Sequence, residues 1–146
     1  MAGFLLDTNH LGEALRPVSR VRDRIGRLHL AGIRIGTCVP VLCELHAGFP
    51  AGERGEKYRR ALDRLLGRVR LWPLDAEVAR LYGEVFQDAR KRGRVLSQVD
   101  MILVALAKQR ELTLATTDRD FEAFSGLKIE NWLQHENTAG PSENSP

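Results

Sequence analysis

The 146-residue chain has few cysteines and no long apolar segment. Its two cysteines, Cys38 and Cys43, match no CxxC or zinc-ligand spacing, and we expect both to be buried, reduced thiols. No apolar run approaches the ~18 residues that span a bilayer, and the first residues lack the basic and apolar regions of a signal peptide. These absences predict a cytoplasmic protein that makes no contact with a membrane.

Length and composition predict one domain. A chain of this length with 43% hydrophobic residues is long enough to bury one ordinary core and too short for two comfortable ones. We expect residues 1–134 to form that domain. Residues 135–146, HENTAGPSENSP, have the polar composition of a disordered tail.

Short apolar runs alternate with amphipathic segments along the chain. Alternating strands and helices are typical of a parallel sheet covered on both faces. The sequence therefore predicts an α/β fold, a three-layer α/β/α sandwich around a central parallel five-stranded sheet. The expected strands are residues 4–7, 33–37, 69–72, 112–116 and 127–130, and the expected helices are about 8–16, 18–31, 39–48, 55–66, 76–91 and 97–111.

Four carboxylates stand where such a sheet would bring them to one edge. A crossover helix runs antiparallel to the strands, so helix N-termini and strand carboxyl ends share the edge where ligands bind. Asp7 ends the first strand and Asp118 follows the fourth, while Glu44 and Asp100 lie in or near the first turns of helices. We expect all four at this edge.

Helix capping is the competing explanation for three of these acids. Asp7 and Asp118 each precede a short helix, and Ser97 with Asp100 resembles a capping box. Glu44 is different, since it lies within a helix among apolar neighbours, and a partly buried carboxylate there needs a cation. A divalent ion shared by the four acids would explain them together.

An all-oxygen donor set favours Mg²⁺, or Mn²⁺, over zinc. Such ions activate water and stabilise the oxygens that attack and leave phosphorus, so these residues predict hydrolysis of a phosphodiester. Crowded acids also repel one another, so one pKa should be raised when no metal is bound. An aspartyl-nucleophile phosphatase is the rival enzyme, but Asn9 stands where that class needs a second Asp.

The motifs FLLDTN, CELHAG, VDMILVALAKQRELTLATTDRDF and GLKIENWL resemble a PIN-domain ribonuclease, and specifically a VapC-type toxin of a toxin–antitoxin pair. The resemblance covers about residues 4–133. It implies an Mg²⁺-dependent endoribonuclease that acts on RNA, forms a homodimer and is held inactive by a VapB-type antitoxin in its groove. The alternative is a non-catalytic module that binds RNA or an antitoxin.

The resemblance also implies site residues. Asp7, Glu44, Asp100 and Asp118 match the family's four acids, with Asp7 and Asp100 as the strongest metal ligands. The auxiliary candidates are Thr8, Asn9, Thr116 and Asp120, the last a competitor of Asp118. His10 replaces a usually apolar residue, and we favour a surface or packing role for it over a role in the site.

Charge patterning adds weak candidates for RNA binding. The net charge is +3, and it becomes +7 for the rest of the chain if a metal neutralises the four acids. Aromatic residues form no RNP-like stacking motif, so recognition would come from groove shape and splayed bases. The basic candidates are Arg16, Arg20, Arg22 and Arg24, and the better-placed run Arg90, Lys91, Arg92 and Arg94.

Overall fold

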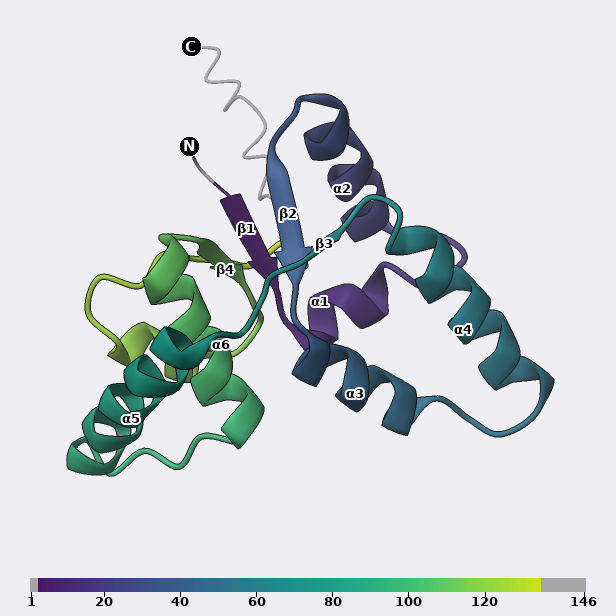
Figure 1. The fold of residues 1–146 in the computed structure, drawn as a ribbon. Coiled ribbons are helices and arrows are strands. Elements are labelled where there is room, and N and C mark those ends of the chain that lie inside the picture. Colours follow the sequence, from purple (N-terminus) through teal and green to yellow (C-terminus); the bar gives the residue numbers. More distant parts are fainter. Residues whose placement is uncertain (1–2, 135–146) are drawn as a thin grey trace, which may run out of the picture.

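The computed structural model describes residues 3–134, and the predicted tail lies outside them. Strands and helices alternate as the sequence predicts, with most boundaries within two residues of those expected. A five-stranded parallel sheet carries helices on both faces (Figure 1). The strands are β1 (Gly3–Leu6), β2 (Arg34–Thr37), β3 (Arg70–Leu71), β4 (Thr113–Ala115) and β5 (Ile129–Glu130); the helices are α1 (Thr8–Glu13), α2 (Arg20–Leu30), α3 (Val39–Gly48), α4 (Glu53–Leu65), α5 (Ala76–Lys91), α6 (Gln98–Arg110) and the 3₁₀ helix η1 (Arg119–Ala123).

Strand order determines where a site can form. The order is β3-β2-β1-β4-β5, and every pairing is parallel. The chain moves outward from β1 to β3 and then returns past β1 to β4 and β5. Because crossovers are right-handed, α1 to α4 are assigned to one face of the sheet, and α5 and α6 to the other. The order reverses between β1 and β4, and open sheets bind ligands beyond the carboxyl ends of strands at such a switch point.

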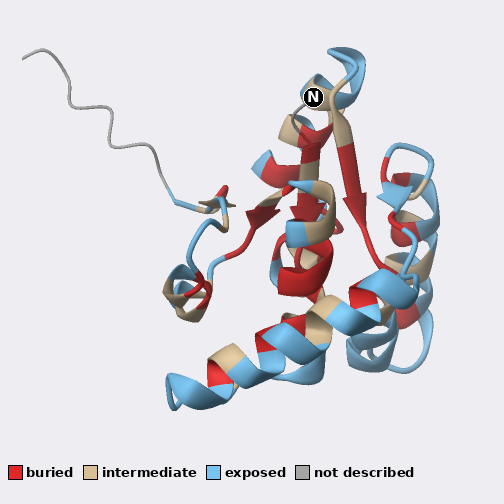
Figure 2. Ribbon diagram, turned by 60° about the vertical axis from the view of Figure 1, so that its left-hand side comes forward, coloured by how far each residue is buried: buried red, intermediate tan, exposed pale blue. Residues whose placement is uncertain are grey.

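The core fills both sides of this sheet. Leu5 and Leu6 of β1 and Leu114 of β4 are fully buried. Helix α6 is buried around most of its circumference, which explains its nearly continuous apolar sequence. Figure 2 shows buried residues concentrated on the strands and the helices beside them, with exposed residues on the outer helix faces.

Helix starts follow local chemistry. Asp75 accepts a hydrogen bond from the N–H of Val78 and caps α5, and Ser97 accepts one from the N–H of Asp100 and caps α6. A proline in the first turn of α3 lacks only a donor that would have had no helical partner. Within residues 3–134, no helix combines the length and apolar character needed to cross a membrane.

One of the two thiols expected inside the protein, and several large apolar side chains, lie at the surface. Cys38 is buried, and burial raises the pKa of its thiol to about 11, but Cys43 is exposed. Val18 is 90% exposed and Leu30 is 88% exposed, because α2 begins at Arg20 and ends at Leu30, so both lie at or beyond its ends. Phe86 on α5 is 43% exposed. Apolar residues at the ends of a helical pattern need not belong to its buried face.

Candidate functional site

Four acids lie around one edge of the sheet. Asp7 directly follows β1 and Asp118 follows β4, so they stand on either side of the switch point. Asp100 is in the first turn of α6 and Glu44 is about one turn into α3. Figure 1 shows β1 and β2 pointing toward α1 and α3 at this edge. Residues separated by up to 111 positions are thus directed to one rim.

Asp7 is buried at the base of this rim, with 6% of its surface exposed. Its N–H donates to the carbonyl of Ala115 on β4 at 3.1 Å, which fixes its backbone across the switch point. Its Oδ1 accepts from the N–H of His10 at 2.8 Å and caps α1. The cap predicted for Asp7 is therefore present, and a cap through one oxygen does not prevent a carboxylate from binding a cation through the other.

Asp100 is the acid whose environment is most unusual. Burial raises the pKa of its carboxyl group above the ordinary value, hydrogen bonding to Ser97 lowers it, and the negative charges of Asp118 and Glu44 raise it further. Three of the four acids therefore influence one another electrostatically. The raised pKa agrees with the sequence prediction, although burial and not crowding is its largest cause.

Glu44 is placed differently from the expectation. The side chains of Val41 and Leu45 face the core, and Glu44 is exposed on another face of α3, so the predicted partial burial is wrong. Its Oε1 accepts a hydrogen bond from the hydroxyl of Thr8 at 2.7 Å. Thr8 thus ties Glu44 to the residue after Asp7, a link that no sequence pattern indicated.

The segment after β4 holds Asp118 through hydroxyl and amide contacts. The buried Thr116 accepts from the N–H of Asp118 at 3.1 Å, and Asp118 Oδ1 accepts from the N–H of Asp120 at 2.8 Å. Asn9 Nδ2 lies 3.5 Å from the hydroxyl of Thr117, so the Asp7 loop also touches this segment. Thr116, Asn9 and Thr8 all support the rim rather than contribute charge to it.

Asp120 is committed to an ion pair. Its Oδ1 receives a hydrogen bond from Arg94 at 2.9 Å, with both side chains about half exposed. Arg92 in the same basic run pairs with Asp88 at 3.0 Å. Two of the four cations in that run are therefore already neutralised, while Arg90 and Lys91 are exposed at the end of α5.

The acids of the rim do not form a compact metal-binding cluster among the described residues. Among residues 3–134, no three His, Cys, Asp or Glu side chains lie close enough to hold one metal ion together. A cavity of about 550 Å³ runs from this rim along α1 and α3. It is lined by Thr8, Asn9, Gly12, Glu13, Leu15, Arg16, Glu44, Leu45, Gly48, Phe49, Pro50, Arg54 and Tyr58.

Comparisons with known proteins agree with this architecture. The PIN domain model matches residues 4–127. Toxin FitB of Neisseria gonorrhoeae is 31% identical over 79% of this chain and 87% of its own, and ribonuclease VapC2 of Haemophilus influenzae is 24% identical over 91% and 100%. The crystal structure of VapBC2 from Rickettsia felis bound to a promoter DNA fragment shares the fold, with a TM-score of 0.80 at 24% identity over 90% of this chain and 99% of that one. Because the matched model spans most of this chain, the protein belongs to the PIN domain family.

Proposed function

We propose that this protein is a metal-dependent endoribonuclease and the toxin of a type II toxin–antitoxin pair. The observation that supports the proposal is the position of Asp7, Glu44, Asp100 and Asp118 along one edge of the sheet, with a carboxyl pKa raised at Asp100 by burial and by its acidic neighbours. Relatives named toxin FitB and ribonuclease VapC2 support the same reading.

The donor set fits a hard divalent cation. All four side chains offer carboxylate oxygens, and a group of acids that repel one another is stabilised by positive charge. Mg²⁺ binds through as few as one or two carboxylates and keeps several waters, so it does not need three close acids. We assign Asp7 and Asp100 as the main ligands, with Glu44 and Asp118 holding outer waters, and Mn²⁺ as a substitute.

A bound divalent ion supplies an activated water and positive charge at the phosphate. The chain itself supplies position. Asp7 is fixed by backbone bonds to His10 and Ala115, and Asp118 is fixed through Thr116. Thr8 orients Glu44 by donating a hydrogen bond to its Oε1. Such preorganisation limits the reorganisation needed when charge develops on the reacting phosphate.

Cleavage of mixed single-stranded RNA tests the proposal. We expect products with Mg²⁺ or Mn²⁺ and none after EDTA. Replacement of an outer-shell group at a metal site typically costs 10- to 100-fold, so Asp7→Asn and Asp100→Asn should reduce cleavage by about 100-fold or more. Asp63→Asn, which removes an exposed acid of α4, is the matched control and should retain activity.

Two results would contradict this mechanism: cleavage that survives EDTA, or cleavage retained by both rim variants. RNA binding without product under every metal would favour the alternative, a non-catalytic RNA- or antitoxin-binding module. The absence of a three-acid metal group among residues 3–134 is the observation that favours that alternative.

We also propose a VapB-type antitoxin as partner and the cavity along α1 and α3 as its binding groove. Phe49 and Tyr58 stack at 5.6 Å on one wall of this groove and offer an apolar surface to a peptide. Coexpression with a VapB-type antitoxin, followed by co-purification and loss of RNA cleavage, tests the pairing. Light scattering tests the proposed homodimer, which should have twice the 16.4 kDa chain mass.

A further inference from the structure

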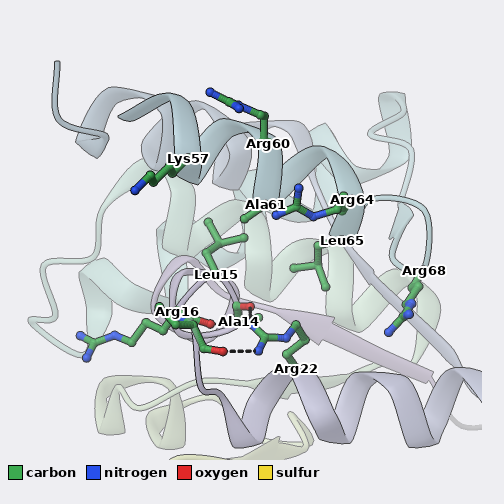
Figure 3. Close-up of a pocket in the computed structure, with 11 residues that line it drawn as sticks. Ala14, Leu15, Arg16, Arg22, Lys57, Arg60, Ala61, Arg64, Leu65 and Arg68 are labelled. Atoms are coloured by element: carbon green, nitrogen blue, oxygen red, sulfur yellow. Dashed lines mark hydrogen bonds between the residues drawn. The ribbon is translucent and has the colours of Figure 1, made fainter. Parts of the chain in front are cut away.

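A strongly basic cleft lies between α4 and the segment that joins α1 to α2 (Figure 3). Its volume is about 580 Å³. None of its lining residues is acidic, although the chain as a whole has nearly as many acids as bases. The six basic residues of this cleft are Arg16, Arg22, Lys57, Arg60, Arg64 and Arg68.

The sequence of α4 places the cations on one side. Lys57, Arg60 and Arg64 recur at intervals of three and four, so they line one stripe of the helix. Ala61 and Leu65 directly follow Arg60 and Arg64 in α4, and they form the floor together with Leu15 of the opposite wall. The floor of the cleft is therefore apolar, and the charged groups surround it.

Most of these charges are not neutralised by the protein. Arg22 donates to the carbonyls of Ala14, Arg16 and Pro17, which fixes its position but leaves its charge. Arg16 pairs with Glu13 at 3.2 Å.

On the other wall, Lys57, Arg64 and Arg68 are exposed and form no ion pair with any residue between 3 and 134. Like charges gathered without counter-charges repel, and an anion in the cleft would remove this cost.

The cleft adjoins the acid rim. Leu15 and Arg16 line both the basic cleft and the cavity that contains Thr8, Asn9 and Glu44. A strand that lies across the rim would reach the cleft by passing over the end of α1. Because four carboxylates at the rim repel phosphates, binding of a polyanion there needs cations close by.

We infer that the basic cleft binds phosphates of the RNA strand on one side of the cleavage point. This inference rests on the proposed ribonuclease function and adds a binding site to it. Phosphates fit better than an acidic peptide, because the cations form a stripe that continues from the rim. Successive phosphates of one RNA strand are spaced along a line in the same way.

Binding of a fluorescent single-stranded 12-mer RNA in EDTA, measured by anisotropy over a range of salt, tests the inference. Each phosphate contact to a single strand contributes about −0.7 to the slope of log K against log salt, so Lys57→Gln with Arg64→Gln should reduce the slope by about 1.4. At 0.15 M salt the same relation gives about tenfold weaker binding.

The matched control is Arg27→Gln with Lys128→Gln, which removes the same charge from exposed positions outside the cleft. It should bind the 12-mer as wild type does. Thermal unfolding of both double variants should match that of wild type, since none of the four side chains is buried.

The outcomes separate the two ideas. If the cleft variant has unchanged affinity and slope while the protein still cleaves RNA, RNA binding by the cleft is overturned and the nuclease proposal stands. Cleft-dependent binding without cleavage would support the cleft and overturn the nuclease. Polyglutamate that binds wild type as tightly as RNA does, and loses affinity in the cleft variant, would show an acidic peptide as the occupant and overturn the inference.

Discussion

The ring of His10 accepts a hydrogen bond at Nε2 from the backbone N–H of Trp132, at 3.0 Å. The two residues are 122 positions apart, and the indole of Trp132 also packs against the Phe4 ring. An accepting Nε2 places the ring proton of a neutral His10 on Nδ1, which lies 3.2 Å from Asp7 Oδ1 without hydrogen-bond alignment. His10 has the packing role predicted for it, and it packs directly beside Asp7 of the rim.

Replacing His10 should therefore loosen the closing segment of the fold. His10→Leu leaves the N–H of Trp132 without its buried partner, a loss of about 1–3 kcal/mol in the free energy of unfolding. Urea denaturation measures it. His29→Leu on the exposed side of α2 is the control and should change stability by less than about 0.5 kcal/mol. Equal stability of the two variants would contradict a structural role for the His10 contact.

A close contact between Gly36 of β2 and Trp72, the residue after β3, predicts a loss of stability when Gly36 is replaced. A Cβ on Gly36 would overlap the indole ring of Trp72 at Nε1, and the indole N–H donates to the carbonyl of Phe4 at 3.2 Å. Gly36→Ala must displace this ring and should destabilise the protein by about 1–3 kcal/mol. Gly83→Ala on α5 meets nothing within 4 Å and should stabilise by about 0.5–1 kcal/mol. Thermal unfolding of the pair compares the two glycines directly.

The two acids after β4 should differ in their contribution to cleavage. Asp118 belongs to the rim, while Asp120 is held by Arg94. Asp118→Asn should reduce RNA cleavage by about 100-fold, and Asp120→Asn by no more than a few-fold. Initial rates with Mg²⁺ at equal protein concentration measure both. A larger loss in the Asp120 variant would transfer the role of fourth acid to that residue.

The cap of α5 should depend on pH. Hydrogen bonds from the N–H of Val78 and from Gln109 lower the pKa of Asp75 below its ordinary value of 3.8. A lowered folded-state pKa means that the charged form stabilises the fold above pH 3.8 and that this stabilisation is lost as pH falls through the folded-state value.

Asp75→Ala should consequently have a lower Tm than wild type at pH 7, and the gap should shrink below pH 3.8. Asp63→Asn, at an exposed acid without such bonds, should follow the wild-type profile. A gap that stays constant down to pH 2 would show that the charge of Asp75 contributes nothing to the cap.

Local chemistry explains what was predictable. Strands and helices were recovered because apolar runs and caps, such as Asp75 and Ser97, act within a few residues. The alternation of strands and helices then predicted that the strands are parallel, and parallel strands place Asp7 and Asp118 at the same edge of the sheet. None of these inferences needed the rotation of a helix about its own axis.

The wrong burial predictions for Glu44 and Cys43 came from the unknown rotation of α3 about its own axis. Helix α3 is apolar on several sides, so its sequence does not show whether Glu44 and Cys43 face the core or solvent. Val41 and Leu45 take the buried side, and the other two are exposed. The contact of His10 with Trp132 was equally hidden, because a pairing across most of the chain leaves no local pattern.

The position of the switch point has a consequence for synthesis of the protein. Asp7 directly follows β1 and is made early, but Ala115, which accepts its N–H at the end of β4, and Asp118 beyond that strand are made much later. A ribosome-bound chain that has exposed only β1 to β3 carries Asp7 and Glu44 without the other half of the rim. A site that needs both halves of the rim can therefore form only after β4 and the segment that follows it have been synthesised.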